Sequence, residues 1–251
     1  MLKHNRLLAL SIALSFALFA SSSNSADLGD GGYRDSELPV SVQNWTGFWL
    51  GAGVGYGAIN NDLNIAPGPA APAGPGLNIS SIGGDGGILT LGLGYDFQIG
   101  PQWVLGALAD YDFSGMKSTA TLPGGGAAKL DVKSQYALGL RFGYLANPNT
   151  LLYMTGGWTR LELDQIALAG GGAAGTITSP KYDGWFLGGG VETMLGSNFV
   201  GNNNVSLKLE YRYSDYKQEL LGVSGAPAGT VIPSLEPSTH TGRFSINYKF
   251  N

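Results

Sequence analysis

A two-residue alternation of apolar and polar positions recurs along this chain from Trp45 to its last residues. In the final segment GRFSINYKFN, every second residue is apolar and the residues between them are polar. The apolar positions of this segment are Phe244, Ile246, Tyr248 and Phe250. Alternation over this length predicts a β-strand whose two faces meet different surroundings.

Eight segments predict strands, and they recur throughout the chain after Trp45. In order, they are TGFWLGAGVGYG, ILTLGLGYDFQ, WVLGALADYDF, SQYALGLRFGY, LLYMTGGWTRLEL, DGWFLGGGVET, VSLKLEYRYS and GRFSINYKFN. Seven of them keep a clear two-residue period. The fifth is ambiguous in parity at Gly156 and Gly157, where we expect a β-bulge. No remaining segment of the mature chain has the period of an amphipathic helix.

The connections between these strands alternate in length. Short turns are expected at IGPQ, ANPNT and around GSNFVGNNN. Long links rich in Gly, Ala and Pro cover residues 59–84, 114–132, 164–182 and 217–239. Short turns at one end and long loops at the other are typical of transmembrane β-barrels.

The alternating segments have the length that a tilted strand needs to cross a bilayer, about 9–11 residues. Backbone groups cannot stay unpaired in hydrocarbon, so eight such strands must close without a free edge. We therefore predict an all-β fold, an eight-stranded antiparallel up-and-down transmembrane β-barrel with short periplasmic turns and long extracellular loops. Its apolar face meets lipid, and its glycine-rich face encloses the lumen.

The lumen of an eight-stranded barrel is just wide enough for side chains to fill it. Charges of both signs fall on the enclosed face, and buried charges need partners. We expect a polar network formed by Asp110, Arg141, Glu192, Lys208, Glu210, Arg212 and Arg243. Lys208 is expected to pair with one of the two glutamates, and the arginines of the last two strands with Glu210 or Asp110. The network is interpreted as an ion-pair plug, with a narrow ion path or gate as the alternative.

Aromatic residues fall at both ends of the apolar face. If the first strand runs outward, one set lies at the periplasmic end: Phe48, Phe97, Trp103, Tyr144, Tyr248 and Phe250. The second set lies at the other end: Tyr56, Tyr111, Phe113, Tyr136, Trp185, Tyr211 and Tyr213. Two aromatic girdles flank the lipid-facing band of a membrane barrel.

The N-terminus has the three parts of a secretory signal peptide. Lys3 and Arg6 precede an apolar run over residues 7–20, and the small polar stretch SSSNSA follows. The run is shorter than the roughly 20 residues of a membrane-spanning helix. We predict a signal peptide over residues 1–26 with cleavage between Ala26 and Asp27, and with Ser23 or Ser25 as alternatives. A periplasmic N-terminal segment over residues 27–44 and an outer-membrane barrel domain over residues 45–251 then follow.

The amino-acid composition excludes several kinds of partner and chemical site. Only 13% of the 251 residues are charged, and 41 are glycine. The net charge of -4 argues against nucleic acid as a partner. The chain contains no Cys, which excludes disulfides and a thiol nucleophile.

Several segments resemble the porin-family outer-membrane β-barrel proteins of alphaproteobacteria, a group with major surface antigens and some hemin-binding members. The resemblance rests on NWTGFWLGAGVGYG, LGLGYDFQ, LLYMTGGW, NYKF and the predicted mature start ADLGDGGYRD. It implies an eight-stranded barrel with surface loops and no wide general pore. The C-terminal strand also resembles the signal that such barrels present to the assembly machinery. That signal normally ends on an aromatic residue, whereas here Asn251 follows Phe250.

Two other activities have candidate residues in the chain. An outer-membrane hydrolase would use a His–Ser–acid set, and His240 lies near Ser238, Ser245 and Glu236. Hemin binding would need a ligand such as Tyr182, Tyr216 or His240, all expected at loop edges. His240 is interpreted as an ordinary rim residue and the tyrosines as girdle residues. No enzyme activity, cofactor or metal site is predicted.

The sequence therefore predicts a structural, surface-exposed outer-membrane protein that supports envelope integrity. A narrow porin-like channel for ions or small solutes is the first alternative, and surface binding of hemin is the second. The expected surroundings are outer-membrane lipid and lipopolysaccharide, with the barrel assembly machinery as a transient partner.

Overall fold

In the computed structural model, the described residues are 44–67, 77–122, 126–164, 166–169, 175–177, 180–195, 204–220 and 231–250. The predicted signal peptide, its cleavage site at Ala26 and Asp27, and nearly all of the N-terminal segment lie outside these residues and stay predictions. No helix that could cross a membrane occurs in the described part of the chain.

Eight long strands form the wall of a barrel. They are β1 (Gly47–Pro67), β2 (Leu77–Ile99), β3 (Trp103–Ser114), β5 (Gly126–Asn147), β6 (Thr150–Leu163), β9 (Lys181–Met194), β10 (Val205–Tyr216) and β12 (Val231–Phe250). Four short strands extend the hairpins at one end of the barrel: β4 (Lys117–Leu122), β7 (Ile166–Ala169), β8 (Gly175–Ile177) and β11 (Glu219–Leu220).

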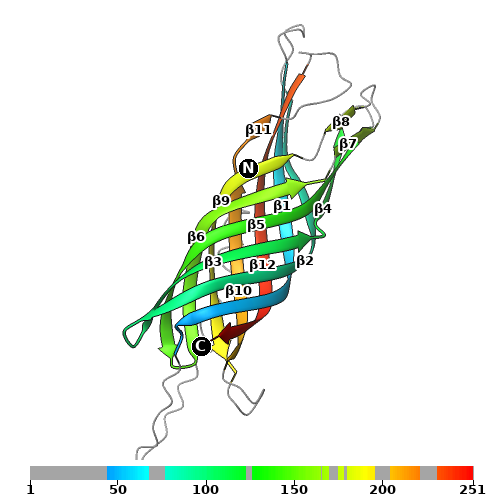
Figure 1. The fold of residues 1–251 in the computed structure, drawn as a ribbon. Coiled ribbons are helices and arrows are strands. Elements are labelled where there is room, and N and C mark those ends of the chain that lie inside the picture. The colour runs from blue at the N-terminus through cyan, green and yellow to red at the C-terminus, as the bar shows by residue number, and fades with distance from the viewer. Residues whose placement is uncertain are drawn as a thin grey trace, which may run out of the picture. The chain divides into compact units, whose positions relative to one another are not determined.

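The sheet closes on itself. Each long strand pairs antiparallel with its neighbours in the sequence, β3 pairs with β5, and β1 pairs with both β2 and β12. The first and last strands are in register from Phe48 opposite Phe250 to Pro67 opposite Val231. Figure 1 shows the tilted strands around the barrel and the C-terminus at the end opposite to β7, β8 and β11. The predicted eight-stranded antiparallel barrel is therefore confirmed.

The two faces of the wall differ as the alternation predicts. On the outside, large apolar side chains are freely exposed, for example Val54 at 60% and Leu140 at 64%. On the inside, Trp49 is 1% exposed and Arg141 is 2% exposed. An outer surface of this kind needs lipid as its solvent, because soluble proteins rarely expose large continuous apolar patches.

Aromatic side chains contact one another in both expected girdles. At the short-turn end, Trp103 stacks on Phe142 and lies 5.1 Å from Tyr144 between ring centroids. At the hairpin end, Tyr111 lies 5.2 Å from Tyr136. These pairs join neighbouring strands on the outer face, where amphipathic rings suit the boundary between lipid and water.

The β-bulge expected at Gly156 and Gly157 is wrong. β6 runs in unbroken register with β9, with Gly156 opposite Leu187 and Gly157 opposite Phe186. A Cβ on Gly157 would overlap the carbonyl oxygen of Leu138, so this glycine lets two strands approach closely without an extra residue. The register shifts of this region lie instead on β5, between Val132 and Ser134 and between residues 145 and 147.

The described residues of the long links are mostly strand. β1 continues to Pro67, β2 begins at Leu77 and β12 begins at Val231. Beyond the girdle the ladder continues through polar pairs such as Asn60 opposite Ser238. Beyond the girdle neither face of the sheet meets lipid, so the apolar alternation stops there. The chain still forms a strand, but the sequence pattern that predicts a strand is absent.

Candidate functional site: the filled lumen

Ten charged side chains are buried among the described residues, and all of them point into the lumen. Five are cations and five are anions: Arg141, Lys208, Arg212, Arg243, Lys249, Asp96, Asp110, Asp112, Glu192 and Glu210. None is more than 6% exposed. Because the two signs are equal in number, this set of buried residues carries no net charge.

Arg141 on β5 organises the cluster at the short-turn end. It forms ion pairs with Asp96 on β2 and with Glu192 on β9. Lys249 Nζ on β12 lies 2.7 Å from Asp96 Oδ2 and donates a second hydrogen bond to the carbonyl oxygen of Trp45 at 2.8 Å. The ion pairs of Arg141 and Lys249 cross the barrel between strands that are not neighbours in the wall.

A second cluster lies toward the hairpin end. Arg212 Nη2 on β10 lies 2.5 Å from Asp110 Oδ2 on β3 and 2.7 Å from Glu210 Oε1. Arg243 Nη2 on β12 lies 2.5 Å from Asp112 Oδ2. The same carboxylate accepts a hydrogen bond from Thr90 Oγ1 at 2.7 Å, so each side of the barrel contributes to the network.

Three inward-facing aromatic residues fill the space between the charges. The ring of Trp49 lies 5.5 Å from the Arg141 guanidinium carbon and 5.1 Å from Lys208 Nζ. Phe186 lies 4.3 Å from the guanidinium carbon of Arg212. Tyr153 donates a hydrogen bond to Glu210 Oε2 at 3.0 Å. Cations over aromatic faces are stabilised by the ring quadrupole, so these rings belong to the ionic network.

Glycines on the inward face of the strands make room for these rings. A Cβ on Gly94 would lie 2.6 Å from the Trp49 ring, and one on Gly139 would lie 2.6 Å from the Phe186 ring. The glycines of the inward face therefore accommodate aromatic rings in the lumen.

Apolar side chains cover both ends of the ionic network. At the short-turn end, Trp45 lies in a cluster with Val104, Leu145, Leu151, Tyr153 and Met194. Trp45 Nε1 donates to the carbonyl oxygen of Pro148 at 3.0 Å, which fixes its ring in this position. At the hairpin end the buried inward-facing apolar and tyrosine side chains include Ile59, Ile88, Met116, Leu130, Val132, Leu161, Leu163, Tyr182, Tyr216 and Leu235. Buried polar side chains lie among them, and Gln135 Nε2 donates a hydrogen bond to Tyr216 Oη at 3.1 Å.

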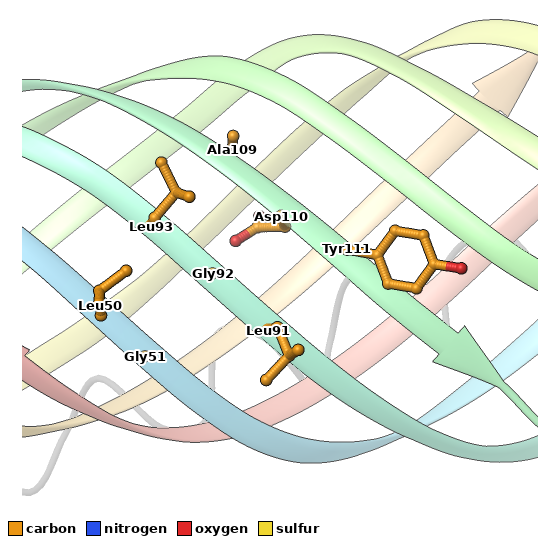
Figure 2. Close-up of a pocket in the computed structure, with 8 residues that line it drawn as sticks. All are labelled: Leu50, Gly51, Leu91, Gly92, Leu93, Ala109, Asp110 and Tyr111. Carbon is orange, nitrogen blue, oxygen red and sulfur yellow. The ribbon is translucent and has the colours of Figure 1, made fainter.

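A groove lies on the outer face of the barrel. It has a volume of about 420 Å³ and its walls include Leu50, Leu91 and Leu93 (Figure 2). The groove reaches Asp110, whose Oδ2 lies 2.5 Å from Arg212 in the lumen. Its lining is otherwise apolar or glycine except for Tyr111, which suits a hydrocarbon chain and supplies no catalytic set.

The structure places all seven sequence-predicted network residues in the lumen. Arg212 contacts both Asp110 and Glu210, and Arg243 Nη1 lies 3.8 Å from Asp110. Lys208 lies 3.9 Å from Glu210, whereas Glu192 pairs with Arg141.

Sequence reasoning missed three charged members of the network, Asp96, Asp112 and Lys249. All three lie at inward positions of their strands, so the two-residue period alone could have found them. The inward Trp49 and Phe186 were missed because each is flanked by apolar residues of the opposite parity.

The candidate residues for other activities do not form a site in the described structure. His240 Nδ1 lies 2.7 Å from Tyr211 Oη, while Ser245 is buried on the opposite, inward face. Tyr182 and Tyr216 are buried in the lumen, so their interpretation as girdle residues is wrong. Both occupy inward positions of β9 and β10. Among the described residues, no group of three or more His, Asp or Glu could hold a metal ion.

Comparisons with known proteins cover nearly the whole chain. Residues 11–250 match the family model described as "Outer membrane protein beta-barrel domain". The "31 kDa outer-membrane immunogenic protein" of Brucella melitensis biotype 1 and that of Brucella suis biovar 1 are each 29% identical to this chain over 246 residues. Each alignment covers 93% of this chain and 96% of the relative. Among solved structures, the outer membrane protein OprG from Pseudomonas aeruginosa aligns with 84% of this chain and 99% of its own, at 13% identity and a TM-score of 0.49.

Proposed function

Because the chain belongs to the family of outer membrane protein β-barrel domains, we propose that it is a structural, surface-exposed protein that supports the integrity of the bacterial outer membrane. The observation that carries this proposal is the filled lumen. Five cations and five anions are buried there, with an apolar cluster at the short-turn end and further buried side chains at the hairpin end. A barrel filled in this way seals its own bore and adds a rigid element to the membrane.

The ionic network favours a permanent plug because opening it is costly. Removing one partner from a buried ion pair leaves an uncompensated charge in a low dielectric, which costs about 3–5 kcal/mol. A passing ion would have to separate Arg141 from Glu192 and Arg212 from Glu210, and then displace Trp45. The narrow-channel alternative therefore receives less support than the plug.

The surface role is supported by the hairpin end and by the relatives. The two Brucella relatives are named immunogenic outer-membrane proteins. The strands of this chain continue beyond the girdle at one end, where β4, β7, β8 and β11 extend the hairpins. We expect these extensions to be the part of the protein that faces the environment.

Hemin binding and hydrolysis receive less support. Tyr182 and Tyr216 are enclosed in the lumen, and His240 is engaged with Tyr211 on the outer face.

The outward aromatic positions of β12, from Phe244 to Phe250, suit the proposed role of this strand as the signal read by the barrel assembly machinery.

Planar-bilayer recording tests the proposal directly. The folded wild-type protein is expected to give no stable single-channel steps. Arg212→Ala removes a lumen cation, and Lys217→Ala is its control because Lys217 is exposed outside the barrel. Stable wild-type steps that Arg212→Ala alters and Lys217→Ala does not would establish a channel function instead.

A further inference from the structure

The inward face of β1 is almost bare between its two ends. The inward residues of this stretch are Gly51, Gly53, Gly55 and Gly57. Trp49 precedes them and Ile59 follows them, and both are buried in the lumen. A Cβ on Gly51 would overlap the side chain of Asn247 on β12. Side chains of β12 therefore lie over the backbone of β1, which offers them no shape to fit against.

This glycine face leaves the register of the closing strand pair open. A slip of two residues keeps every side chain on its own face of the sheet, whereas a slip of one residue reverses the faces. On β12, Ser245 lies opposite Gly53, and Arg243 lies opposite Gly55. After a slip of two residues in either direction, both side chains would again face a glycine. Glycine-rich strands are prone to such slips, so other contacts must select the register that the barrel adopts.

The side chain of Lys249 joins the strands of the closing pair at the short-turn end. Lys249 lies on β12 opposite Trp49 and is buried. Its Nζ donates hydrogen bonds to the carbonyl oxygen of Trp45 at 2.8 Å and to Asp96 Oδ2 at 2.7 Å. Nζ also lies 4.8 Å from the ring centroid of Trp45. One ammonium group thus connects β12 to the chain that leads into β1 and, beyond it, to β2.

The residues that accept from Lys249 are themselves held in place. The backbone N–H of Trp45 donates to Gln98 Oε1 at 3.0 Å, and the backbone N–H of Gln98 donates to Thr46 Oγ1 at 3.0 Å. These two bonds fasten the entry of β1 to β2. A slip of two residues moves Lys249 by about 7 Å along the strand, because each residue rises about 3.4 Å. With its side chain in the same conformation, Nζ would lose both acceptors and leave a buried ammonium group unpaired, which is costly.

We infer that Lys249 selects the register in which β1 and β12 close the barrel. This role goes beyond the proposed function, because it holds whether or not the lumen conducts. The register of the closing pair sets the stagger of the strands around the barrel. It therefore decides which side chains meet across the lumen, such as Arg243 on β12 and Asp112 on β3. The competing explanation is that this cross-lumen pair selects the register and that Lys249 only follows it.

Backbone NOEs between opposite residues of neighbouring strands measure the register of the folded protein in detergent micelles. In the native register Leu50 lies opposite Tyr248, so the wild type should show NOEs between these two residues. Lys249→Met is expected to show a second register that is shifted by two residues. Its NOEs should connect Leu50 with Ile246 or with Phe250.

Arg243→Met is the matched control, because it removes another buried cation of β12 and breaks the bond to Asp112. This variant should keep the native NOEs alone. Lys249→Gln keeps an amide donor and should show the shifted register at lower intensity than Lys249→Met. If Lys249→Met does not fold, the Gln variant decides the question with the same NOEs.

Two results would overturn the role of Lys249. The first is a purely native register in every Lys249 variant that folds. The second is a shift in Arg243→Met as large as the shift in the Lys249 variants, because the register would then depend on the ionic network as a whole.

Discussion

Each buried charge in the lumen depends on partners from strands that are distant in the sequence. Arg141 and Glu192 are 51 residues apart, and Arg212 and Asp110 are 102 residues apart. Taking such groups out of water costs several kcal/mol per ion, which only close and complete pairing offsets. The identity of each lumen residue is therefore tied to the others, and a single replacement affects the whole cluster.

Replacing Arg212 tests this dependence at one residue. Arg212→Met leaves Asp110 and Glu210 without their closest cation, and we expect the free energy of unfolding to fall by about 3–5 kcal/mol. Urea unfolding of the protein in lipid, followed by tryptophan fluorescence, measures the change. Lys217→Met is the matched control, and its stability should stay close to that of the wild type. Equal losses in the two variants would show that Arg212 gains nothing from its buried partners.

At the scale of the strand, glycine decides where neighbouring strands can approach and where rings can enter the lumen. Gly157 on β6 lies against the backbone of Leu138 and Gly139 on β5. Gly242 on β12 is different, because a methyl group in place of its hydrogen would have no atom within 4 Å. Both glycines therefore lie in barrel strands, but only Gly157 is needed for the close approach of a neighbouring strand.

We expect Gly157→Ala to destabilise the protein by about 1–3 kcal/mol, because the added methyl group forces the β5–β6 pair apart. Gly242→Ala adds the same methyl group into open space and should leave stability nearly unchanged. Heat-modifiability on electrophoresis, with urea unfolding as the quantitative measure, separates the two. A neutral Gly157→Ala would mean that β5 and β6 can move apart without loss.

At the scale of the whole molecule, the barrel has a polar interior and an apolar exterior. The outer face exposes Val54, Leu140 and most of the aromatic residues, while the inner face buries ten charges. This distribution suits hydrocarbon outside and a sealed interior, and it is the reverse of the arrangement in a soluble barrel. Closure through β1 and β12 removes the free edges that lipid could not solvate.

Spin labels test this orientation, and the absence of Cys gives a clean background. Labels at Val54→Cys and Leu140→Cys are expected to show high accessibility to oxygen, which partitions into lipid, and low accessibility to a water-soluble nickel complex. A label at Glu236→Cys, beyond the girdle, should show the opposite preference. Water-like accessibility at positions 54 and 140 would contradict a lipid-facing outer wall.

The sequence by itself determined the number of barrel strands, the direction of each face and the enclosed position of the predicted charges. It could do so because lipid requires every second residue of a spanning strand to be apolar, and this requirement can be read from each strand separately. The requirement does not apply beyond the girdle, where no lipid hydrocarbon is present. The extensions of β1 and β12 carry polar residues on both sides there and were expected to be loops.

Only the tertiary structure decided which charges pair and what fills the space between them. Arg141 could have met several carboxylates, and its choice of Asp96 and Glu192 follows from the tilt and register of strands on opposite sides of the barrel. The inward positions of Trp49 and Phe186 likewise depend on the space that facing glycines provide. Alternation states which side of the wall a residue occupies, but contacts across a lumen depend on three-dimensional register, which no local pattern encodes.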